Sequence, residues 1–500
     1  GVDKFEKLEY ADPYQMVVDN RDKIKGAIIY HERLTDAAMA SRGRYRERYG
    51  DIALMNLTLM LCAYHEAIAL NRMQYTILKE DYGLELEILG DTTKFMEKNE
   101  DGSFSDERGS REVWDRVYRY ALDKLADGLT DKAIAHNPGF QAAQFDYIVA
   151  NKIFTYNRIF GDEATEQERE MELSILSVSK PNTPIFGVWY LQEDEGNFAP
   201  LITQKYKYFV VTYETFNLSW TSGLPYEPFT VEEPEIELDP TKKYVSFSFT
   251  EGDNISYLTM RMPLQFESAR RGEVPVGWSL TPTVWDLAPN VVRYLKQNWA
   301  EGDGLVMAEG YVYFTPPEES RDGFFALQDA YFARTGSGAM RMLLPDPADP
   351  LPSAEKMSRL DSLWLGYLDT NNDNYNNDSS HFLFRDRPVF VHYNGNLAAN
   401  LAQADGSAPA FYAVTLYGWN ADPGTAANIM ESLGDEFVAV TPKQLAQLYR
   451  QYYASRFKDI TQAAFSAGMT REEMGFLYRA SNYTHYSRQD GSRYADGNNE

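Results

Sequence analysis

Nine short apolar runs, each ending in a polar or glycine-rich loop, constrain the fold of this 500-residue chain more than any other feature. Most runs are continuously apolar rather than alternating, which is typical of strands buried on both faces of a parallel sheet. Helical segments are expected between several of them, for example over 284–300 and 426–433. The runs span 185–191, 208–213, 244–249, 276–280, 305–313, 363–368, 388–393, 411–419 and 436–440.

Strands that alternate with helices over about 260 residues predict an α/β fold with a (β/α)8-like barrel, which we place at 181–455. An open, doubly wound sheet is the alternative. Residues 456–500 are expected to form a helical appendage with a polar tail. Neither a dinucleotide-binding glycine motif nor a phosphate-binding loop is present, so no nucleotide cofactor is expected.

Residues 1–170 are predicted to form a mainly helical or mixed α/β N-terminal region. Apolar and aromatic side chains recur at helical spacing around Trp114 and again over 145–160, which predicts two buried helix faces. A strand is expected over 84–89. The apolar run 52–70 contains the single cysteine, Cys62, which is expected to be a small buried side chain.

The net charge restricts the partners of the chain. With 74 acidic and 48 basic residues, the formal charge is −26, so nucleic-acid and membrane-surface partners are not expected. No apolar run reaches the roughly 20 residues of a membrane-spanning helix. Because the chain starts at Gly1 without a methionine, we expect a secreted, periplasmic or cell-surface protein whose signal peptide has been removed.

Carboxylates follow several of the predicted strands, and aromatic residues accompany them. In a parallel barrel the carboxyl ends of the strands meet at one face, where catalytic groups gather. Flat aromatic rings beside acids suit a sugar, whose ring stacks on the aromatic while its hydroxyls bond to carboxylates and amides. The candidate substrate-binding residues are Trp189, Glu193, Glu214, Glu251, Asn254, Tyr311 and Tyr313.

Two patterns raise the question of a metal site. Asp369, Asn371 and Asp373 alternate like the start of a calcium-binding loop, but the glycine and glutamate that such a loop needs are replaced, so an ordinary Asn-rich loop is favoured. His381 and His392 lie in the barrel region without a zinc-type spacing. No metal and no cofactor are therefore expected.

The segments PIFGVWYLQEDEG, YVSFSFTEGDNISYL, AEGYVYFTP and EFVAVTPKQL, in this order, resemble the glycoside hydrolase family named after the motif GxGYxYP. Gly310, Tyr311 and Tyr313 match the motif, whereas Ala308 replaces its first glycine and Phe314 stands where proline is expected. The resemblance implies a barrel-like C-terminal domain, smaller N-terminal domains, and export in bacteria that process polysaccharides.

We therefore predict a carbohydrate hydrolase with Asp253 and Glu309 as its catalytic carboxyl pair. Glu309, between an apolar strand and aromatic side chains, is expected to have a raised pKa and to act as general acid. Asp253, in a more polar loop, is expected to stay ionised as nucleophile or base. The alternatives are a non-catalytic glycan-binding protein on a degenerate barrel, and a metal-dependent polysaccharide deacetylase that uses Asp253 with His381 or His392.

Overall fold

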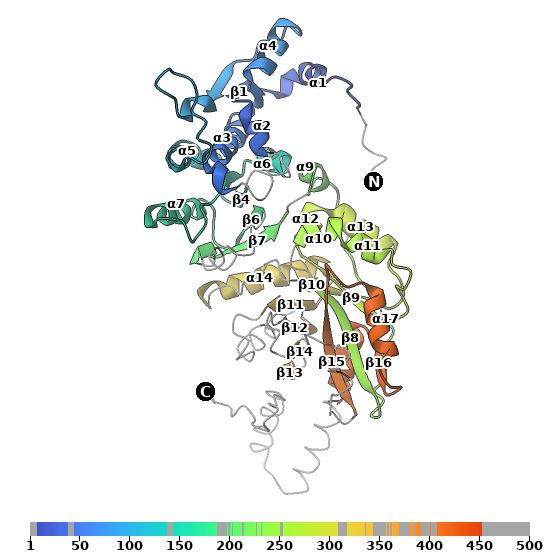
Figure 1. Ribbon diagram of the computed structural model, residues 1–500. Helices are drawn as coiled ribbons and strands as arrows, with labels where there is room; N and C mark the ends of the chain where they lie inside the picture. The colour runs from blue at the N-terminus through green and yellow to red at the C-terminus, as the bar shows by residue number, and fades with distance from the viewer. Residues whose placement is uncertain are drawn as a thin grey trace. The chain divides into compact units, whose positions relative to one another are not determined.

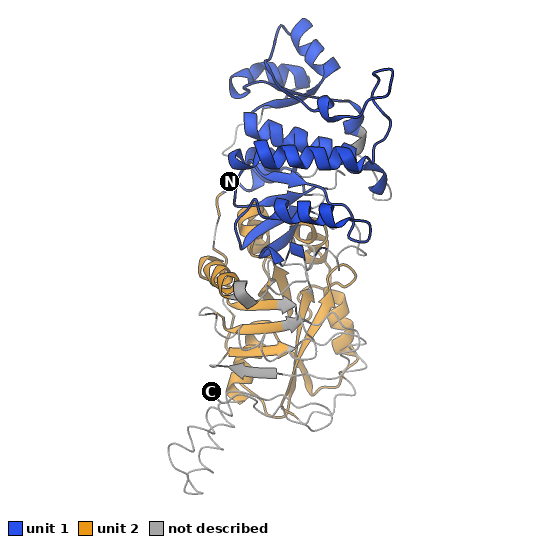
Figure 2. Cartoon of the chain, turned by 90° about the vertical axis from the view of Figure 1, so that its left-hand side faces the viewer, with its two compact units in different colours: residues 1–224 blue, residues 225–500 orange. Residues whose placement is uncertain are grey.

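The computed structural model consists of two compact units, Gly1–Leu224 and Pro225–Glu500 (Figure 2). Within them the structure describes residues 8–38, 45–137, 144–187, 198, 201–202, 204–212, 215–226, 228–231, 233–250, 254–308, 318–335, 337–343, 357, 360, 363–369, 381–384, 387–391, 401 and 408–452.

The first unit contains two parallel sheets with helices around them (Figure 1). One sheet has the order β2-β1-β3, with β1 at Ala27–Tyr30, β2 at Ile68–Asn71 and β3 at Ile88–Asp91. The other has the order β5-β4-β6-β7, with strands at Ile134–His136 (β4), Phe154–Tyr156 (β5), Thr183–Gly187 (β6) and Lys207–Val211 (β7). The helices are α1 (Pro13–Asp19), α2 (Arg33–Ala38), α3 (Tyr49–His65), α4 (Arg72–Glu80), α5 (Arg111–Lys124), α6 (Phe145–Ala150), α7 (Glu166–Leu176) and α9 (Leu218–Thr221).

Helices α3 and α5 pack against each other at the centre of this unit. α3 is apolar on all sides and buried along almost its whole length, Cys62 included. Burial raises the pKa of the Cys62 thiol to about 12, so it packs as an inert hydrophobe. The predicted stripe on α5 is buried too, and the Trp114 indole donates to the carbonyl oxygen of Asn157 at 2.7 Å. The predicted amphipathic helix around Trp114 is confirmed.

The predicted helix over 145–160 is correct only in its first part. α6 ends at Ala150, Lys152 adopts a left-handed backbone with φ of 52°, and the chain then enters β5. The residues of β5 are fully buried in a parallel sheet, where an aromatic and a β-branched side chain fit well. The aromatic spacing resembled a helix because one short helix and one short strand follow each other closely.

The second unit is built on one nine-stranded sheet with the order β13-β14-β12-β11-β10-β9-β8-β15, and β16 pairs with β8 beside it. Every pairing is parallel except that of β13 with β14. The strands are β8 (Lys243–Thr250), β9 (Val276–Leu280), β10 (Asp303–Ala308), β11 (Ala339–Leu343), β12 (Leu365–Asp369), β13 (His381–Phe384), β14 (Arg387–Val391), β15 (Ala410–Tyr417) and β16 (Phe437–Ala439).

Helices connect these strands and cover the sheet. Phe266, from α11, packs against Trp278 of β9, which in turn stacks on Phe249 of β8, so this layer lies on one face. The helices are α10 (Asn254–Met260), α11 (Met262–Phe266), α12 (Val284–Leu287), α13 (Pro289–Gln297), α14 (Glu318–Thr335), α17 (Pro423–Glu431) and one over residues 442–452.

The sheet curls strongly without closing into the predicted eight-stranded barrel. Side chains from β8, β10, β11, β12, β14 and β15 meet in one hydrophobic cluster. Because neighbouring strands lie about 4.8 Å apart, strands at the two ends of a flat sheet could not share a core. Among the described strands, however, no ladder joins β14 or β13 to β15. The α/β class and the curled parallel sheet are as predicted, and the arrangement is a half-barrel.

Two of the nine predicted barrel strands lie elsewhere. β6 and β7, which correspond to the runs 185–191 and 208–213, pair with β4 and β5 in the first unit. The prediction that placed them in the barrel is therefore wrong. An apolar run indicates that a strand forms, but the strand with which it pairs depends on tertiary packing. Conversely, β11 belongs to the half-barrel although its short segment was not recognised as a strand, because Arg341 interrupts it.

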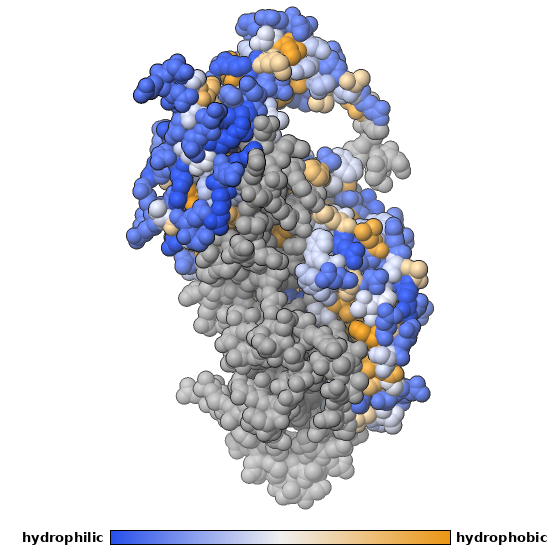
Figure 3. Space-filling view, in the orientation of Figure 1, coloured by the Kyte–Doolittle hydropathy of each residue, from blue (hydrophilic) through white to orange (hydrophobic). Residues whose placement is uncertain are grey.

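The surface of the molecule agrees with its composition. The face of the first unit that is visible in Figure 3 is mostly hydrophilic, as expected for a chain with a net charge of −26. None of the described helices combines the length and the hydropathy that crossing a membrane requires.

Candidate active site on the concave face of the half-barrel

The carboxyl ends of seven parallel strands define one edge of the half-barrel. β8, β9, β10, β11, β12, β14 and β15 run in the same direction, so their last residues lie along this edge (Figure 1). In parallel α/β sheets, ligands bind outside the carboxyl ends of the strands. The concave face changes in character from the amino ends of the strands toward this edge.

The amino half of the concave face is apolar and filled. Tyr244 of β8 stacks on Phe411 of β15, with ring centroids 5.7 Å apart. The helix over 442–452 packs beneath them with Leu445 and Tyr449, among others. Thr441 and Gln444 cap the start of this helix reciprocally, because each side chain accepts a hydrogen bond from the other residue's backbone N–H. This end of the half-barrel is a packed core.

The carboxyl half of the concave face is polar. Side chains alternate between the two faces of a strand. The residues two and four positions after those of the apolar half therefore point to the same concave face. These positions carry hydroxyl groups and a guanidinium, which we call the polar layer: Ser246, Ser248, Ser279, Arg341, Tyr367 and Thr415. All six residues are buried. Because burying polar groups costs free energy unless they are hydrogen-bonded, a polar layer above an apolar one is typical of a binding site.

Tyr367 lies at the centre of the polar layer. Burial raises the pKa of its hydroxyl above the ordinary value, while the side chains of Ser246 and Ser248 and the charge of Arg341 act in the opposite direction. The hydroxyl therefore stays protonated over the physiological range and is a hydrogen-bond donor among neighbouring acceptors.

Arg341 crosses the concave face from β11 to β8. Its Nη1 donates to the carbonyl oxygen of Phe249 at 2.7 Å, and the Ser279 hydroxyl donates to the same oxygen at 2.5 Å. Arg341 is only 4% exposed. Arg341 was not among the residues predicted from the sequence, although an arginine between apolar residues in AMRML is a recognisable signal of a functional or structural role.

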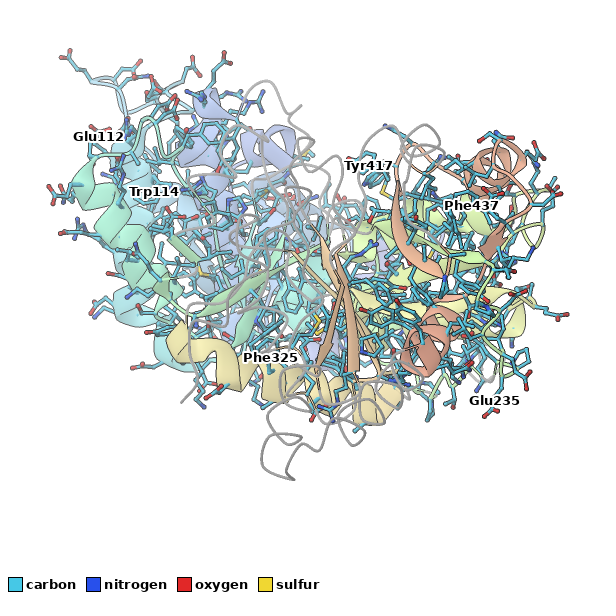
Figure 4. All side chains as sticks on the ribbon, turned by 90° about the horizontal axis from the view of Figure 1, so that it is seen from below. Glu112, Trp114, Glu235, Phe325, Tyr417 and Phe437 are labelled. Carbon is cyan, nitrogen blue, oxygen red and sulfur yellow. The ribbon has the colours of Figure 1, made fainter. Side chains whose placement is uncertain are left out.

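An exposed tyrosine ends β15 at the same edge. The six residues before Tyr417 are buried, whereas Tyr417 itself is 54% exposed. It pairs in register with Thr250, the last residue of β8, and Figure 4 shows it at the end of its strand. Tyr417 is an even number of residues from Phe411 and Ala413, which face the concave core, so it lies on the same face of the strand. Tyr417 is thus an aromatic ring at the rim of the polar layer.

A carboxyl group also lies beneath the polar layer. Glu233 belongs to the acidic connection 231–243; it is half-buried and accepts a hydrogen bond from the Thr441 hydroxyl. Burial raises the pKa of Glu233. The charge of Glu233 also raises the pKa of Tyr367.

The two predicted catalytic residues and four of the predicted binding residues follow β8 and β10 in the sequence. Asp253, Glu251, Glu309, Tyr311 and Tyr313 lie outside the described residues. Asn254 begins α10, but its side chain is also outside the described part. In the sequence, Asp253 comes three residues after the end of β8, and Glu309 directly follows the end of β10.

Three other predicted binding residues follow strands of a different sheet. Trp189 and Glu193 come after β6, and Glu214 comes after β7, so all three belong to the first unit. They also lie outside the described residues. The prediction placed β6 and β7 in the barrel, and this is wrong. The three residues therefore follow strands of another sheet than the one that precedes Asp253 and Glu309.

No group of three potential metal ligands occurs in the described parts of the chain. His381 starts β13, but its side chain is not described, and His392 lies outside the described residues. The Asn-rich segment after Asp369 falls outside them as well.

A protein-family model matches the part of the chain that forms the half-barrel. Residues 241–450 match a family model described as "GxGYxYP putative glycoside hydrolase C-terminal domain". The match begins just before β8 and ends within the helix over 442–452, so it spans the whole half-barrel. The resemblance seen in the sequence is thereby confirmed for this part of the chain.

Solved structures support the fold. A "putative hydrolase" from Bacteroides thetaiotaomicron is similar with a TM-score of 0.70 and 18% identity, over 88% of this chain and 83% of that chain. At this identity the likeness establishes the fold alone. A "putative polysaccharide deacetylase" from Mycobacterium smegmatis matches with a TM-score of 0.30 and 10% identity, over 46% of this chain and 96% of that chain, which is too distant to support an argument. No curated protein matches the sequence.

Proposed function

We propose that the protein is a glycoside hydrolase that acts on an oligo- or polysaccharide, with Asp253 and Glu309 as its two catalytic carboxyl groups. The observation that carries the proposal is the position of their strands. β8 and β10 flank β9 in parallel, so the two acids follow strands that end at the same edge. Two strand spacings amount to about 9.6 Å, which is compatible with the carboxyl separations of about 5 to 9.5 Å that glycosidases use.

The rim supplies a group that a sugar needs. The exposed Tyr417 ring can stack on the face of a pyranose, above the buried polar layer. The match of residues 241–450 to a glycoside hydrolase family model supports the same substrate class. In this proposal Glu309 protonates the leaving oxygen, and Asp253 acts as nucleophile or activates water.

The test is hydrolysis of a broad glycan panel by the wild type, Asp253→Asn and Glu309→Gln. General acid and base groups contribute about 10²- to 10⁴-fold, so we expect each substitution to lower kcat by at least 10²-fold. Glu235→Gln is the matched control, since Glu235 is an exposed acid of the same unit (Figure 4).

Two outcomes contradict the proposal. Turnover that survives both substitutions excludes this carboxyl pair. Glycan binding by the wild type without any turnover identifies a glycan-binding protein on a half-barrel instead.

A further inference from the structure

The carbonyl group of Phe249 is held by side chains at the point where the ladder between β8 and β9 stops. The two strands are paired only at Phe247 with Val276 and at Ser248 with Gly277. One residue later, the Phe249 oxygen accepts the hydroxyl of Ser279 at 2.5 Å and Nη1 of Arg341 at 2.7 Å. Side-chain donors therefore fix the end of β8 on the side where backbone pairing has ended.

The arginine makes this contact from a distant strand. β11 is separated from β8 by β10 and β9, so the side chain reaches across the concave face, which the curl of the sheet permits. Both Arg341 and Phe249 are buried. A charged donor to a carbonyl gives a stronger hydrogen bond than a neutral one, and it keeps its charge at all relevant pH values.

We propose that Arg341 is a positioning residue for the reaction: it anchors the carboxyl end of β8, from which the segment with Asp253 departs, and places a permanent positive charge at this edge. The inference rests on the proposed function. Asp253 follows Phe249 by four residues in the sequence, so the anchored carbonyl is close to it along the chain. A positive charge at the edge from which this segment departs favours the ionised form of a carboxyl group, which is the form that a nucleophile or base needs.

The kinetic test compares Arg341→Met and Arg341→Lys with Ser279→Ala. We expect Arg341→Met to lower kcat at least tenfold and to move the acidic limb of the pH profile of kcat/KM upward by about one unit, because the positive charge is lost. Arg341→Lys keeps the charge and should leave that limb in place. Ser279→Ala removes a neutral donor to the same carbonyl and should leave it in place as well.

A second measurement does not depend on activity. Amide hydrogen exchange of peptides that cover residues 247–253 should speed up at least tenfold in Arg341→Met, relative to the wild type, while peptides from α3 and α5 should not change. The α3 and α5 peptides serve as an internal control for global unfolding.

The outcomes separate this inference from the proposed function. An unchanged pH profile in Arg341→Met, with activity lost only in proportion to unfolded protein, overturns the positioning role. Unchanged exchange at 247–253 overturns the anchor. A wild type without turnover on any glycan contradicts the proposed function, and the exchange experiment then still decides whether Arg341 holds the end of β8.

Discussion

At the scale of single residues, Tyr417 offers the most accessible test of sugar binding. An exposed ring at the rim of a polar layer can stack on a sugar, and we expect this contact to be of the same order as a pair of aromatic rings, about 0.5 to 1.5 kcal/mol. We expect Tyr417→Ala to raise KM about three- to tenfold with little change in kcat, and Tyr417→Phe to behave like the wild type. Tyr64→Ala, at an exposed tyrosine of the first unit, is the control. Equal KM values for Tyr417→Ala and the wild type would show that the ring does not contact the substrate.

Lys207 gives a prediction about pH and stability. Its ammonium group is buried at the start of β7 and donates to the carbonyl oxygen of Ser179 at 2.6 Å. Burial lowers its pKa to about 8 from 10.5. Between these two values the unfolded chain binds a proton that the folded protein does not, so the free energy of unfolding rises with pH across this window.

The measurement is denaturant unfolding at pH 7 and pH 10 for the wild type and Lys207→Met. The wild type should gain about 2 to 3 kcal/mol over this range relative to the variant, which lacks the titrating group. Lys94→Met, at an exposed position of the same unit, should follow the wild type. A parallel pH dependence in the wild type and Lys207→Met would contradict the lowered pKa.

At the scale of elements, the sequence predicted strands better than it predicted their partners. The apolar runs at β8, β9, β12, β14 and β15 signalled strands because side chains on both faces of the sheet are largely buried there. β11 was missed because its arginine serves the polar layer, and functional positions are where local patterns fail. β6 and β7 were recognised as strands but assigned to the barrel. Pairing is decided by contacts between segments distant in the sequence, which no local run contains.

The contact between the helix over 442–452 and the sheet shows how much depends on such distant residues. Pro442 packs directly on Gly304 of β10 and on Gly277 of β9. A β-carbon at Gly304 would lie 2.5 Å from Cδ of Pro442, and one at Gly277 would lie 2.8 Å from its Cγ. The two glycines read as weak strand residues in isolation. Glycine is needed at both positions because a helix more than 130 residues later in the chain approaches the strands closely there.

At the scale of the whole molecule, the sequence indicated the edge where chemistry is expected but not which residues share it. Acids after apolar strands pointed to the carboxyl edge of a parallel sheet, and β8 and β10 do end at one edge. Trp189 and Glu214 looked equivalent to Asp253 because each follows an apolar run. They belong to a different sheet in a different unit. Arg341 and Tyr417 became visible only once the curl of the sheet brought β11, β8 and β15 onto one concave face.

The two units also predict how the molecule unfolds. Each has its own sheets and its own hydrophobic clusters, so we expect two calorimetric transitions rather than one. Gly304→Ala forces a β-carbon against Pro442 and should cost about 1 to 3 kcal/mol by overpacking. It should lower the transition of the second unit by several degrees and leave the other in place.

Gly223→Ala is the matched control, because a β-carbon there meets its nearest neighbour at an ordinary 3.5 Å. That variant should move neither transition appreciably. If Gly304→Ala shifted both transitions equally, or if the wild type unfolded in a single step with equal calorimetric and van't Hoff enthalpies, the two units would be one cooperative structure. The anchoring of β8 by Arg341 would then have to be measured against the stability of the entire chain rather than that of the half-barrel.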